Sequence, residues 1–387
     1  MLESRIMFAD EGTSPAKIAV VGVGGGGGNA LSRMIDAGLQ GVKFVAVNTD
    51  VQALWSNRAL TKVQIGQKLT NGLGAGANPE VGRRAAIDDT ESICEALNGS
   101  DMVFITTGLG GGTGTGAAPV VASIASRLGG DNAQVLTVAV VTLPFALEGK
   151  KRMEQARQGL AELRKYADSV IAIPNDRVLH SVPRNTPVHE AFSVADDVLL
   201  QAVQGITDII TLPGQINVDF ADVRAVMRRT GRAVMGIGMG EGPLRALTAA
   251  QRAVSNPLLE DSSMQGARSI VVNITGGADL SLAETSEATG FITRVADPEA
   301  NVIYGIVTNE TLRNAVRVTV IATGFEQETK NGNGAATEPQ AVAAADANGK
   351  AAGAETANGK AANGNGGAEG RRVGLVRRMF GRRGKKE

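Results

Sequence analysis

The chain is poor in the residues that build redox centres, metal sites and aromatic binding surfaces. Its 387 residues include one cysteine, Cys94, and two histidines, His180 and His189. A single cysteine cannot form a disulfide within the chain and fits a reducing cytosol. We therefore expect no dedicated metal site and no histidine-based catalysis. Aromatic residues make up only 3%, which argues against a stacking surface for single-stranded nucleic acid, and we expect no nucleic-acid partner.

Long apolar runs are also missing. The sequence is 43% hydrophobic and 20% charged, yet no run of about 18 apolar residues suggests a membrane-spanning helix. Residues 1–14 have no long apolar core, so they are not typical of a signal peptide. We expect a cytoplasmic protein with a flexible N-terminal extension (1–14), long enough for two domains.

The formal net charge of zero conceals two oppositely charged parts. Residues 371–387 contain six arginines, two lysines and one glutamate, a net charge of +7, so the remainder carries −7. Residues 329–370 are a low-complexity stretch in which Val342 is the only large aliphatic residue. Such a segment buries too little apolar surface to offset the entropy of ordering. We predict a disordered linker (328–370) and a separate basic tail (371–387).

Strands and helices alternate along the first half of the chain. Apolar runs typical of buried strands occur at 17–23, 43–48, 101–106, 134–142 and 169–174. Helices are expected from Asn29 onward and over 148–166. Strands that are apolar throughout indicate a parallel sheet with both faces covered. This alternation predicts a Rossmann-like α/β domain (15–187).

A long central helix (188–212) is predicted after this domain. Apolar residues recur at helical spacing at Val188, Phe192, Ala195, Leu199, Ala202, Ile206 and Ile209. The helix would be roughly 35 Å long at 1.5 Å per residue. Beyond it, runs at 268–274, 301–307 and 316–322 read as strands of a smaller α+β domain (213–327).

Three glycine-rich loops stand out in the first domain. The longest is Gly108-Leu-Gly-Gly-Gly-Thr-Gly-Thr-Gly116, and the others lie at 22–28 and 72–79. All three should meet at the carboxyl edge of the sheet, where open α/β sheets bind ligands. Glycine lets consecutive N–H groups turn toward one anion, and the threonines add hydroxyl donors. The long loop lacks the lysine of a Walker A motif, so we infer a phosphate held by backbone.

The kind of phosphate ligand follows from the number of loops. Gly22-Val-Gly-Gly-Gly-Gly27 matches the dinucleotide pattern, and Asp50 stands where a ribose-binding acid would sit. Alone, this pattern also fits a tight turn with no ligand. Three converging amide-rich loops suit a triphosphate better than the pyrophosphate of a dinucleotide.

Two pairs of residues offer contacts to the rest of a nucleotide. Phe192 and Asp196 lie one helical turn apart, so a ring could stack on a purine while the carboxylate accepts from guanine's adjacent N–H donors. Plain core packing is the simpler reading of Phe192. Glu148 and Arg152 have i,i+4 spacing, which an exposed ion pair would also explain.

The segment Asn217-Val-Asp-Phe-Ala-Asp222 follows the break after the central helix. Asp219 could cap the next helix with Asp222 in its first turn. Alternatively, both could polarise a water for attack on phosphorus. They are far along the chain from the glycine loops, so a head-to-tail neighbour would have to supply them, and such contacts build open filaments.

Taken together, these motifs resemble the FtsZ family, the prokaryotic relatives of tubulin that assemble the division ring. The similarity runs in order through about residues 15–326. It is carried by 22–29, Asn48-Thr-Asp50, 72–79, the tubulin-type signature 110–116, 144–145, 148–152, 174–176, 192–197 and 217–222.

The resemblance implies a GTPase that binds GTP and GDP with Mg²⁺ on the phosphates rather than in a protein site. The implied phosphate-loop residues are Gly24, Gly25, Gly26, Gly27, Gly28, Asn29, Gly111, Gly112, Thr113, Gly114, Thr115 and Gly116. By the same analogy Glu148, Arg152 and Asn175 lie along the ribose, and Phe192 and Asp196 hold guanine. Asn217, Asp219 and Asp222 would enter the next subunit's site, so that hydrolysis needs assembly.

The C-terminus departs from the family. FtsZ chains usually end in an acidic-then-apolar peptide with a proline that docks tethering and regulatory partners. Here 371–383 is basic, and as a helix it would gather Val373, Val376, Met379 and Phe380 in one arc. This pattern is typical of contact with an anionic membrane surface. An acidic protein partner, including the protein's own body, and nucleic acid are the other readings of the tail.

The predicted function is a GTPase that polymerises head-to-tail and forms the contractile ring at the septum, with 213–327 as its polymerisation domain. Its partners would be itself and the division-ring and membrane-tethering proteins. The alternatives are a dinucleotide-dependent oxidoreductase and a GTP-binding scaffold that hydrolyses poorly. The presence of both Asp219 and Asp222 argues against the scaffold.

Overall fold

The computed structural model describes residues 16–129, 134–178, 183, 185–212, 214–259, 264 and 266–325. The predicted N-terminal extension, linker and basic tail lie outside these residues. The division of the chain at 187, 212 and 327 stays a prediction, because the described residues form part of one compact unit, 1–328.

A single 11-stranded sheet runs through this unit in the order β3-β2-β1-β4-β5-β6-β8-β11-β9-β10-β7. The strands are β1 (Ile18–Val23), β2 (Val42–Asn48), β3 (Thr61–Gln64), β4 (Met102–Gly108), β5 (Leu136–Leu143), β6 (Ser169–Pro174), β7 (Gly214–Ile216), β8 (Gly231–Glu241), β9 (Ser269–Gly276), β10 (Asn301–Thr308) and β11 (Ala315–Thr323). The helices are α1 (Gly24–Asp36), α2 (Val51–Ser56), α3 (Gln67–Thr70), α4 (Pro79–Asp88), α5 (Thr90–Leu97), α6 (Thr113–Ala125), α7 (Lys150–Leu163), α8 (Asn175–Val178), α9 (Val188–Thr211), α10 (Phe220–Met227), α11 (Arg245–Val254) and α12 (Leu282–Val295), with short 3₁₀ turns η1 (Ala146–Glu148) and η3 (Pro257–Leu259).

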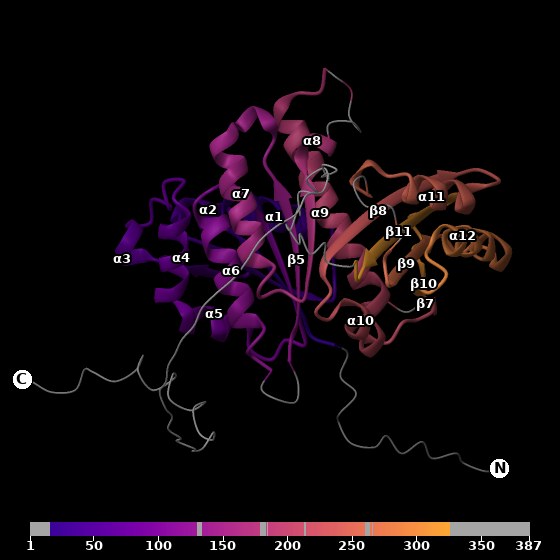
Figure 1. Cartoon of the computed structure of the whole chain (residues 1–387), viewed down its shortest axis with the longest axis horizontal. Coiled ribbons are helices and arrows are strands. Elements are labelled where there is room, and N and C mark those ends of the chain that lie inside the picture. The colour runs from indigo at the N-terminus through magenta and orange to yellow at the C-terminus, as the bar shows by residue number, and fades with distance from the viewer. Residues whose placement is uncertain are drawn as a thin grey trace, which may run out of the picture. The chain divides into compact units, whose positions relative to one another are not determined.

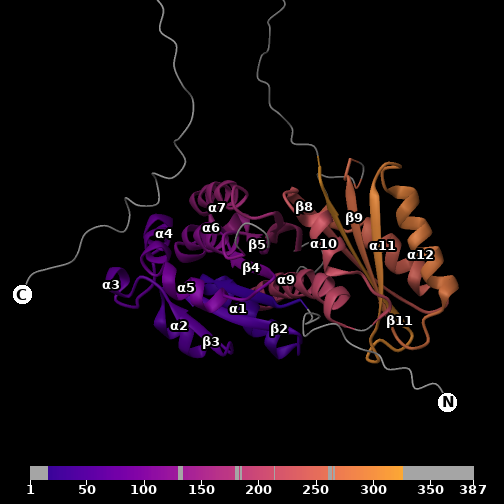
Figure 2. The same ribbon diagram turned by 90° about the horizontal axis from the view of Figure 1, so that it is seen from below.

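The first half is the predicted parallel sheet. Strands β3, β2, β1, β4, β5 and β6 pair in parallel throughout. Every residue of β1 is buried, because helices cover both faces. Helices α1, α9 and α10 pack on one face, while α4, α5, α6 and α7 pack on the other, as Figure 2 shows. This arrangement confirms the Rossmann-like α/β fold.

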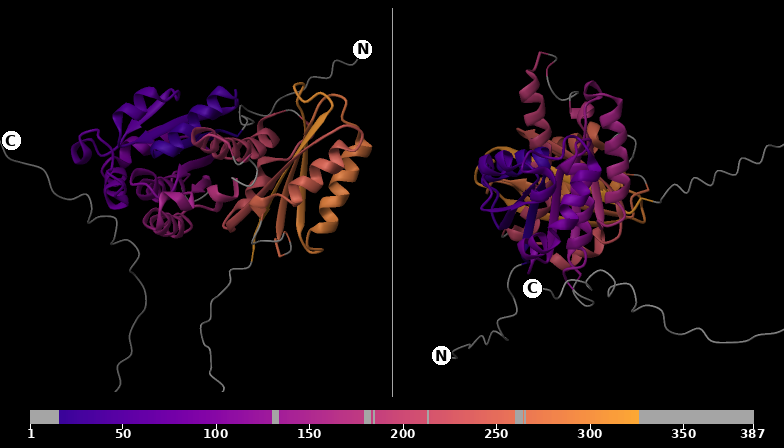
Figure 3. Two further views of the ribbon diagram at one scale, coloured as in Figure 1. Left: turned by 90° about the horizontal axis from the view of Figure 1, so that it is seen from above. Right: turned by 90° about the vertical axis from the view of Figure 1, so that its left-hand side faces the viewer.

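The second half continues the same sheet with mixed strand directions. β8 pairs in parallel with β6 over only three residues, and β11 is antiparallel to both β8 and β9. Helices α11 and α12 cover the face turned away from α9, as Figures 1 and 3 show. The predicted strands β9, β10 and β11 and the predicted central helix are confirmed.

Glycine in β8 lets α11 approach the sheet closely. A Cβ on Gly236 would clash with the Ala253 carbonyl oxygen of α11, and one on Gly240 would lie 2.9 Å from the Ala249 amide nitrogen. Only a residue without a side chain fits at such distances, so α11 packs directly on the strand backbone.

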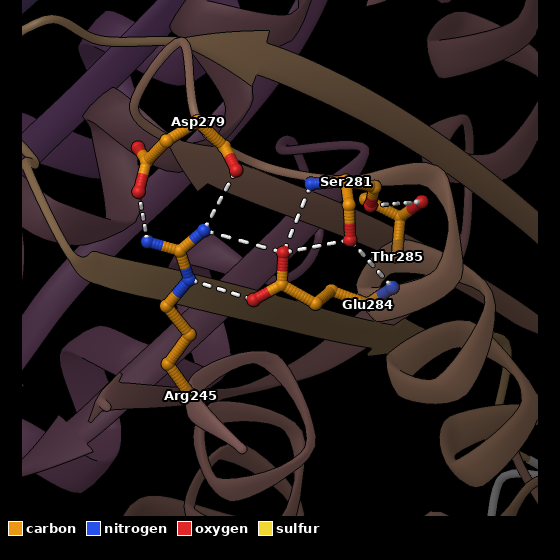
Figure 4. Close-up of polar contacts among 5 residues, drawn as sticks. All are labelled: Arg245, Asp279, Ser281, Glu284 and Thr285. Carbon is orange, nitrogen blue, oxygen red and sulfur yellow. Dashed lines mark hydrogen bonds and ion pairs between the residues drawn. The ribbon is translucent and has the colours of Figure 1, made fainter. Parts of the chain in front are cut away.

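A buried arginine joins α11 to α12 (Figure 4). The Arg245 side chain is 7% exposed and forms ion pairs with Asp279 and Glu284. Its guanidinium also donates to the Asp279 carbonyl oxygen at 2.9 Å. Ser281 and Glu284 form a reciprocal capping box at the start of α12. The arginine thus fixes the loop that precedes α12, and its charge is compensated by two carboxylates.

Candidate functional site

Two glycine loops lie side by side because the strands that deliver them are neighbours. β1 and β4 pair in parallel with Val23 opposite Thr107. Helix α1 begins immediately after β1, and α6 begins a few residues after β4. Both helices therefore start at the carboxyl edge of the sheet, where parallel α/β sheets bind ligands.

Close backbone contacts bring all three glycine loops together. A Cβ on Gly24 would lie 2.8 Å from the Gly114 amide nitrogen, and one on Gly26 would lie 3.2 Å from that of Gly108. A Cβ on Gly112 would lie 2.8 Å from the amide nitrogen of Asn78, in the third loop. The convergence expected from the sequence is present, and it depends on the absence of side chains.

The glycines of these loops divide into two groups. Added Cβ atoms on Gly25 and Gly111 would meet nothing within 4 Å, so these residues border open space, and one on Gly28 would meet only the side-chain Nδ2 of Asn57, at 3.2 Å. Gly27 instead packs on the Thr106 backbone, and Gly116 packs on α4. The first group can contact a ligand directly, whereas the second group allows the helices to pack.

The threonine hydroxyls of the long loop are engaged within the protein. Thr113 Oγ1 lies 2.7 Å from Thr49 Oγ1, and Thr115 Oγ1 accepts a hydrogen bond from the Gly110 amide at 2.8 Å. Neither α1 nor α6 has a side-chain cap at its N-terminus. The first-turn N–H groups of α1 and α6 are therefore the hydrogen-bond donors that this edge offers to an anion.

Asp50 has a structural role. Its carboxylate caps α2, accepting hydrogen bonds from the amides of Gln52 at 2.9 Å and Ala53 at 3.3 Å. Both bonds go to Oδ1, so helix capping by itself explains an acid at this position, without a ribose.

A cleft of about 740 Å³ lies between α1 and α9, and it brings Asn29, Phe192 and Asp196 together. Phe192 is 41% exposed, so plain core packing does not describe it. Its ring meets Phe145 edge-on, with the centroids 5.0 Å apart. The buried Phe145 thus holds Phe192 with part of its ring open to the cleft.

Asp196 has unusual electrostatics. Its pKa is raised to about 7, chiefly by burial; Arg33 opposes this shift, and the neighbouring Asp197 adds to it. Arg33 forms a bidentate ion pair with Asp197, in which one of the two hydrogen bonds is 2.7 Å long. This pair ties α1 to α9 and leaves Asp196 as the carboxylate that faces the cleft without its own hydrogen-bonded cation.

The predicted ribose-side residues lie near the long glycine loop. Glu148 and Arg152 form the expected ion pair, and Glu148 also accepts from the Phe145 amide at 3.0 Å. A Cβ on Gly110 would lie 3.0 Å from the Arg152 carbonyl oxygen. Asn175 is buried, and its Oδ1 has no hydrogen-bond partner among the described residues.

The structure does not bring Asn217, Asp219 and Asp222 to this site. All three are exposed at the far end of α9, next to α10 (Figure 1). Asp219 occupies the N-cap position of α10 without a side-chain capping bond. The span from Asp196 to the end of α9 is roughly 22 Å at 1.5 Å per residue. Within one subunit, the two sets of residues are separate.

Sequence reasoning missed several residues of the cleft. Arg33 and Ser32 line it beside Asn29, and the position of Arg33 one turn after Asn29 is a signal that could have found it. Asn57 donates to the Gly28 carbonyl oxygen at 2.7 Å and so holds the first loop. No local sequence pattern indicates that contact.

The residues that the structure describes contain neither a cluster of metal ligands nor a helix that could span a membrane. No group of three or more histidine, cysteine, aspartate or glutamate side chains there could hold a metal ion. In the same part of the chain, every helix is too short or too polar to cross a membrane.

Comparison with known proteins gives the family. Residues 17–183 match the GTPase domain of the tubulin/FtsZ family, and residues 231–326 match the C-terminal domain of the FtsZ family. An empty FtsZ dimer from M. jannaschii is 46% identical, with a TM-score of 0.75, over 81% of this chain and 89% of its own. A tryptophan-to-tyrosine mutant of M. jannaschii FtsZ is 47% identical, with a TM-score of 0.75, over 80% and 92% of the two chains.

A more distant relative shares the architecture. The CetZ2 protofilament from Haloferax volcanii, with GTPγS bound, is 25% identical, with a TM-score of 0.69, over 80% of this chain and 94% of its own. The chain is a GTPase that binds GTP and GDP, and it belongs to the FtsZ family.

Proposed function

We propose that this GTPase polymerises head-to-tail and cleaves GTP in a site completed by the next subunit. The observation that carries this proposal is the separation along α9. The glycine loops and Asp196 lie at one end, and the exposed Asp219 and Asp222 lie at the other. A heterologous contact between unlike ends repeats without closing and builds a filament. The M. jannaschii dimer and the CetZ2 protofilament are assemblies of related chains.

The nucleotide would lie along the carboxyl edge of the sheet. Its phosphates would accept hydrogen bonds from the first-turn amides of α1 and α6, from Gly24 to Asn29 and from Gly111 to Gly116. The ribose would face Glu148, Arg152 and the open Oδ1 of Asn175. Guanine would stack on the exposed part of Phe192, while Asp196 accepts from its ring N–H and exocyclic amine.

Mg²⁺ would be held by phosphate oxygens and water. The loop edge offers backbone amides, whereas its threonine hydroxyls are engaged within the protein. The Asp50 carboxylate, just after β2, caps α2. A hard cation with few protein ligands is typical of Mg²⁺ at nucleotide phosphates, where it neutralises charge. The residues present fit an ion carried in with the nucleotide.

Asp219 and Asp222 would orient and polarise the attacking water, with Asn217 beside them. Their carboxylates make no capping bond that would compete with this role. Since they arrive on a neighbouring subunit, hydrolysis would require assembly. The polymer would act in the cytoplasm at the division septum as the contractile ring, together with division-ring and tethering proteins and with the 371–383 tail on anionic lipid.

A two-nucleotide mixing experiment tests the shared site. Asp196→Asn replaces an acceptor with a donor, so it should prefer xanthosine triphosphate, whose C2 oxygen accepts where guanine donates. Asp222→Ala keeps GTP binding but lacks the activating carboxylate. When the two variants are mixed with GTP and xanthosine triphosphate, GTP should be hydrolysed. The Asp222→Ala subunit holds the GTP, and the neighbouring Asp196→Asn subunit supplies the intact Asp222.

The control replaces the first variant by the double variant Asp196→Asn, Asp222→Ala. This mixture should co-sediment as polymer and leave GTP intact. If GTP turnover fails to return in the first mixture although both variants are found in the pellet, the shared site is wrong.

A further inference from the structure

A second cavity lies on the side of the sheet away from the α1–α9 cleft. It has a volume of about 630 Å³ and lies between α4, α6 and α7, which are neighbours in Figures 1 and 2. We call it the rear groove. This volume is within the range of small-molecule sites, roughly 300–1,000 Å³.

The floor of the rear groove is built from small residues. Thr115 and Gly116 of α6 and Gly159 of α7 line it. A Cβ on Gly116 would lie 2.7 Å from the Arg83 amide nitrogen, and one on Gly159 would press on the Thr115 side chain. The three helices therefore contact one another through backbone, and the space above them stays open.

Apolar and polar side chains both line the groove, and two arginines and two glutamates among them, Arg83, Arg127, Glu80 and Glu162, balance in charge. Ile87 is 47% exposed and Tyr166 is 39% exposed, and both face the groove with Val120. Arg83 is bound to Glu80 by two hydrogen bonds of 2.7 and 2.9 Å. Arg127 also lines the groove, and its guanidinium makes no hydrogen bond or ion pair with any residue that the structure describes. Aliphatic and aromatic side chains beside such a guanidinium fit a planar aromatic anion.

All three helices of the groove begin at or contact the glycine loops near their N-terminal ends. α4 starts at Pro79, directly after the 72–78 loop, and its cap Asn78 lies against Gly112. α6 starts at Thr113 inside the long loop, and α7 carries Arg152 against Gly110. A molecule bound in the groove contacts all three helices, so its affinity depends on their spacing, and that spacing also sets the relative positions of the loops.

We propose that the rear groove binds a planar aromatic molecule bearing one carboxylate or sulfonate, and that its occupation changes nucleotide affinity. The binding half stands on the groove alone. The coupling half rests on the proposed placement of the nucleotide phosphates in the glycine loops. Coupling between sites is typically about 5- to 150-fold in affinity and is reciprocal.

Anilinonaphthalene sulfonate is the probe, added to the full-length chain loaded with GDP. We expect saturable binding of one probe per chain, weakened about tenfold or more by Arg127→Gln and abolished by Val120→Trp, which fills the groove. Arg157→Gln is the matched control, since Arg157 is an exposed arginine of α7 outside the groove, and it should bind the probe as the unaltered chain does.

Coupling is measured as probe affinity with GDP bound and after its removal. We expect at least a fivefold difference, and a matching change in GDP affinity when probe is present. Binding that Arg127→Gln and Val120→Trp leave unchanged would overturn the site, as would simple displacement of the probe by excess GDP. Equal probe affinity with and without GDP would overturn the coupling. That result would not bear on the proposed shared catalytic site, which the mixing experiment tests. Should Val120→Trp not fold, Arg127→Gln against Arg157→Gln decides the question.

Discussion

The two ends of α9 carry carboxylates in opposite environments. Asp196 at the first end is partly buried and has its pKa raised to about 7, and the Arg33–Asp197 pair fixes the helix around it. Asp219 and Asp222, beyond the other end, are exposed. A carboxylate that reads a base needs a fixed, partly desolvated setting. Carboxylates that wait for a neighbour's nucleotide can remain in water until the contact forms.

The largest effect should come from the exposed end. Asp222→Ala should lower GTP turnover about 10³-fold, because loss of a group that activates the attacking water typically costs 10²–10⁴-fold. GTP affinity should change less than twofold. Turnover and equilibrium binding are measured on the same preparation, with the exposed Asp88→Ala as control. A parallel loss of affinity would contradict the division of roles between the two ends.

A change remote from both ends should affect folding alone. Arg245→Met leaves Asp279 and Glu284 without their shared cation, which should lower the free energy of unfolding by about 2–3 kcal/mol. This is near or below the lower limit of the usual cost of breaking a buried ion pair, because both carboxylates are partly exposed. Denaturant unfolding measures this loss, with the exposed Arg294→Met as control. GTP affinity should remain unchanged, and a decrease would show that the C-terminal half shapes the nucleotide site.

The same network gives this prediction a pH signature. Arg245 lowers the pKa of Glu284 to about 2 from 4.5 and also lowers that of Asp279. Depressed carboxylate pKa values stabilise the fold above the unfolded-state pKa, and that contribution is lost as the pH falls toward 2. The stability difference between Arg245→Met and the unaltered chain should therefore shrink below about pH 4.

Convergence of the loops can be tested with two adjacent glycines. A Cβ on Gly112 would lie 2.9 Å from Ala75 Cβ and 2.8 Å from the Asn78 amide nitrogen, whereas one on Gly111 would meet nothing within 4 Å. Gly112→Ala should destabilise the nucleotide-free protein by about 1–3 kcal/mol, as overpacking does. Gly111→Ala should change stability by less than about 0.5 kcal/mol. Equal stabilities by thermal unfolding would mean that the loops do not touch.

The smallest effect is the pH dependence of the buried end. The Asp196 carboxylate must be ionised to accept from guanine, so GDP affinity should fall roughly eightfold from pH 7.5 to pH 6 for a pKa of about 7. Its raised pKa has the opposite effect on folding, since the folded state binds the extra proton and nucleotide-free stability decreases as the pH rises. The Asp196→Asn variant is measured in parallel as a reference, because protonation of the GDP phosphates affects both proteins but only the unaltered chain has the titrating carboxylate. An identical pH slope in that variant would contradict the role of Asp196.

Much of the first half could be predicted from the sequence because its strands are apolar on both faces. β8 was missed because Gly236, Gly238 and Gly240 interrupt its pattern, and the reason for them is the approach of α11, which no local pattern reveals. The edge strands β3 and β7 are too short to show a period. In the site, the loop motifs predicted their own convergence. The contact of Phe145 with Phe192 and the capping by Asp50 depend on tertiary geometry instead.

The length of α9 has a consequence for the proposed polymer. One helix of 24 residues, about 36 Å long, carries Phe192 and Asp196, which we propose bind guanine. It leads to Asp219 and Asp222, which we propose activate water. In a filament where unlike ends meet, successive nucleotides can be no closer along the axis than this helix allows. α9 would then act as a ruler for the spacing of the filament. Removing four residues would shorten that ruler by roughly 6 Å and change its phase by about 40°.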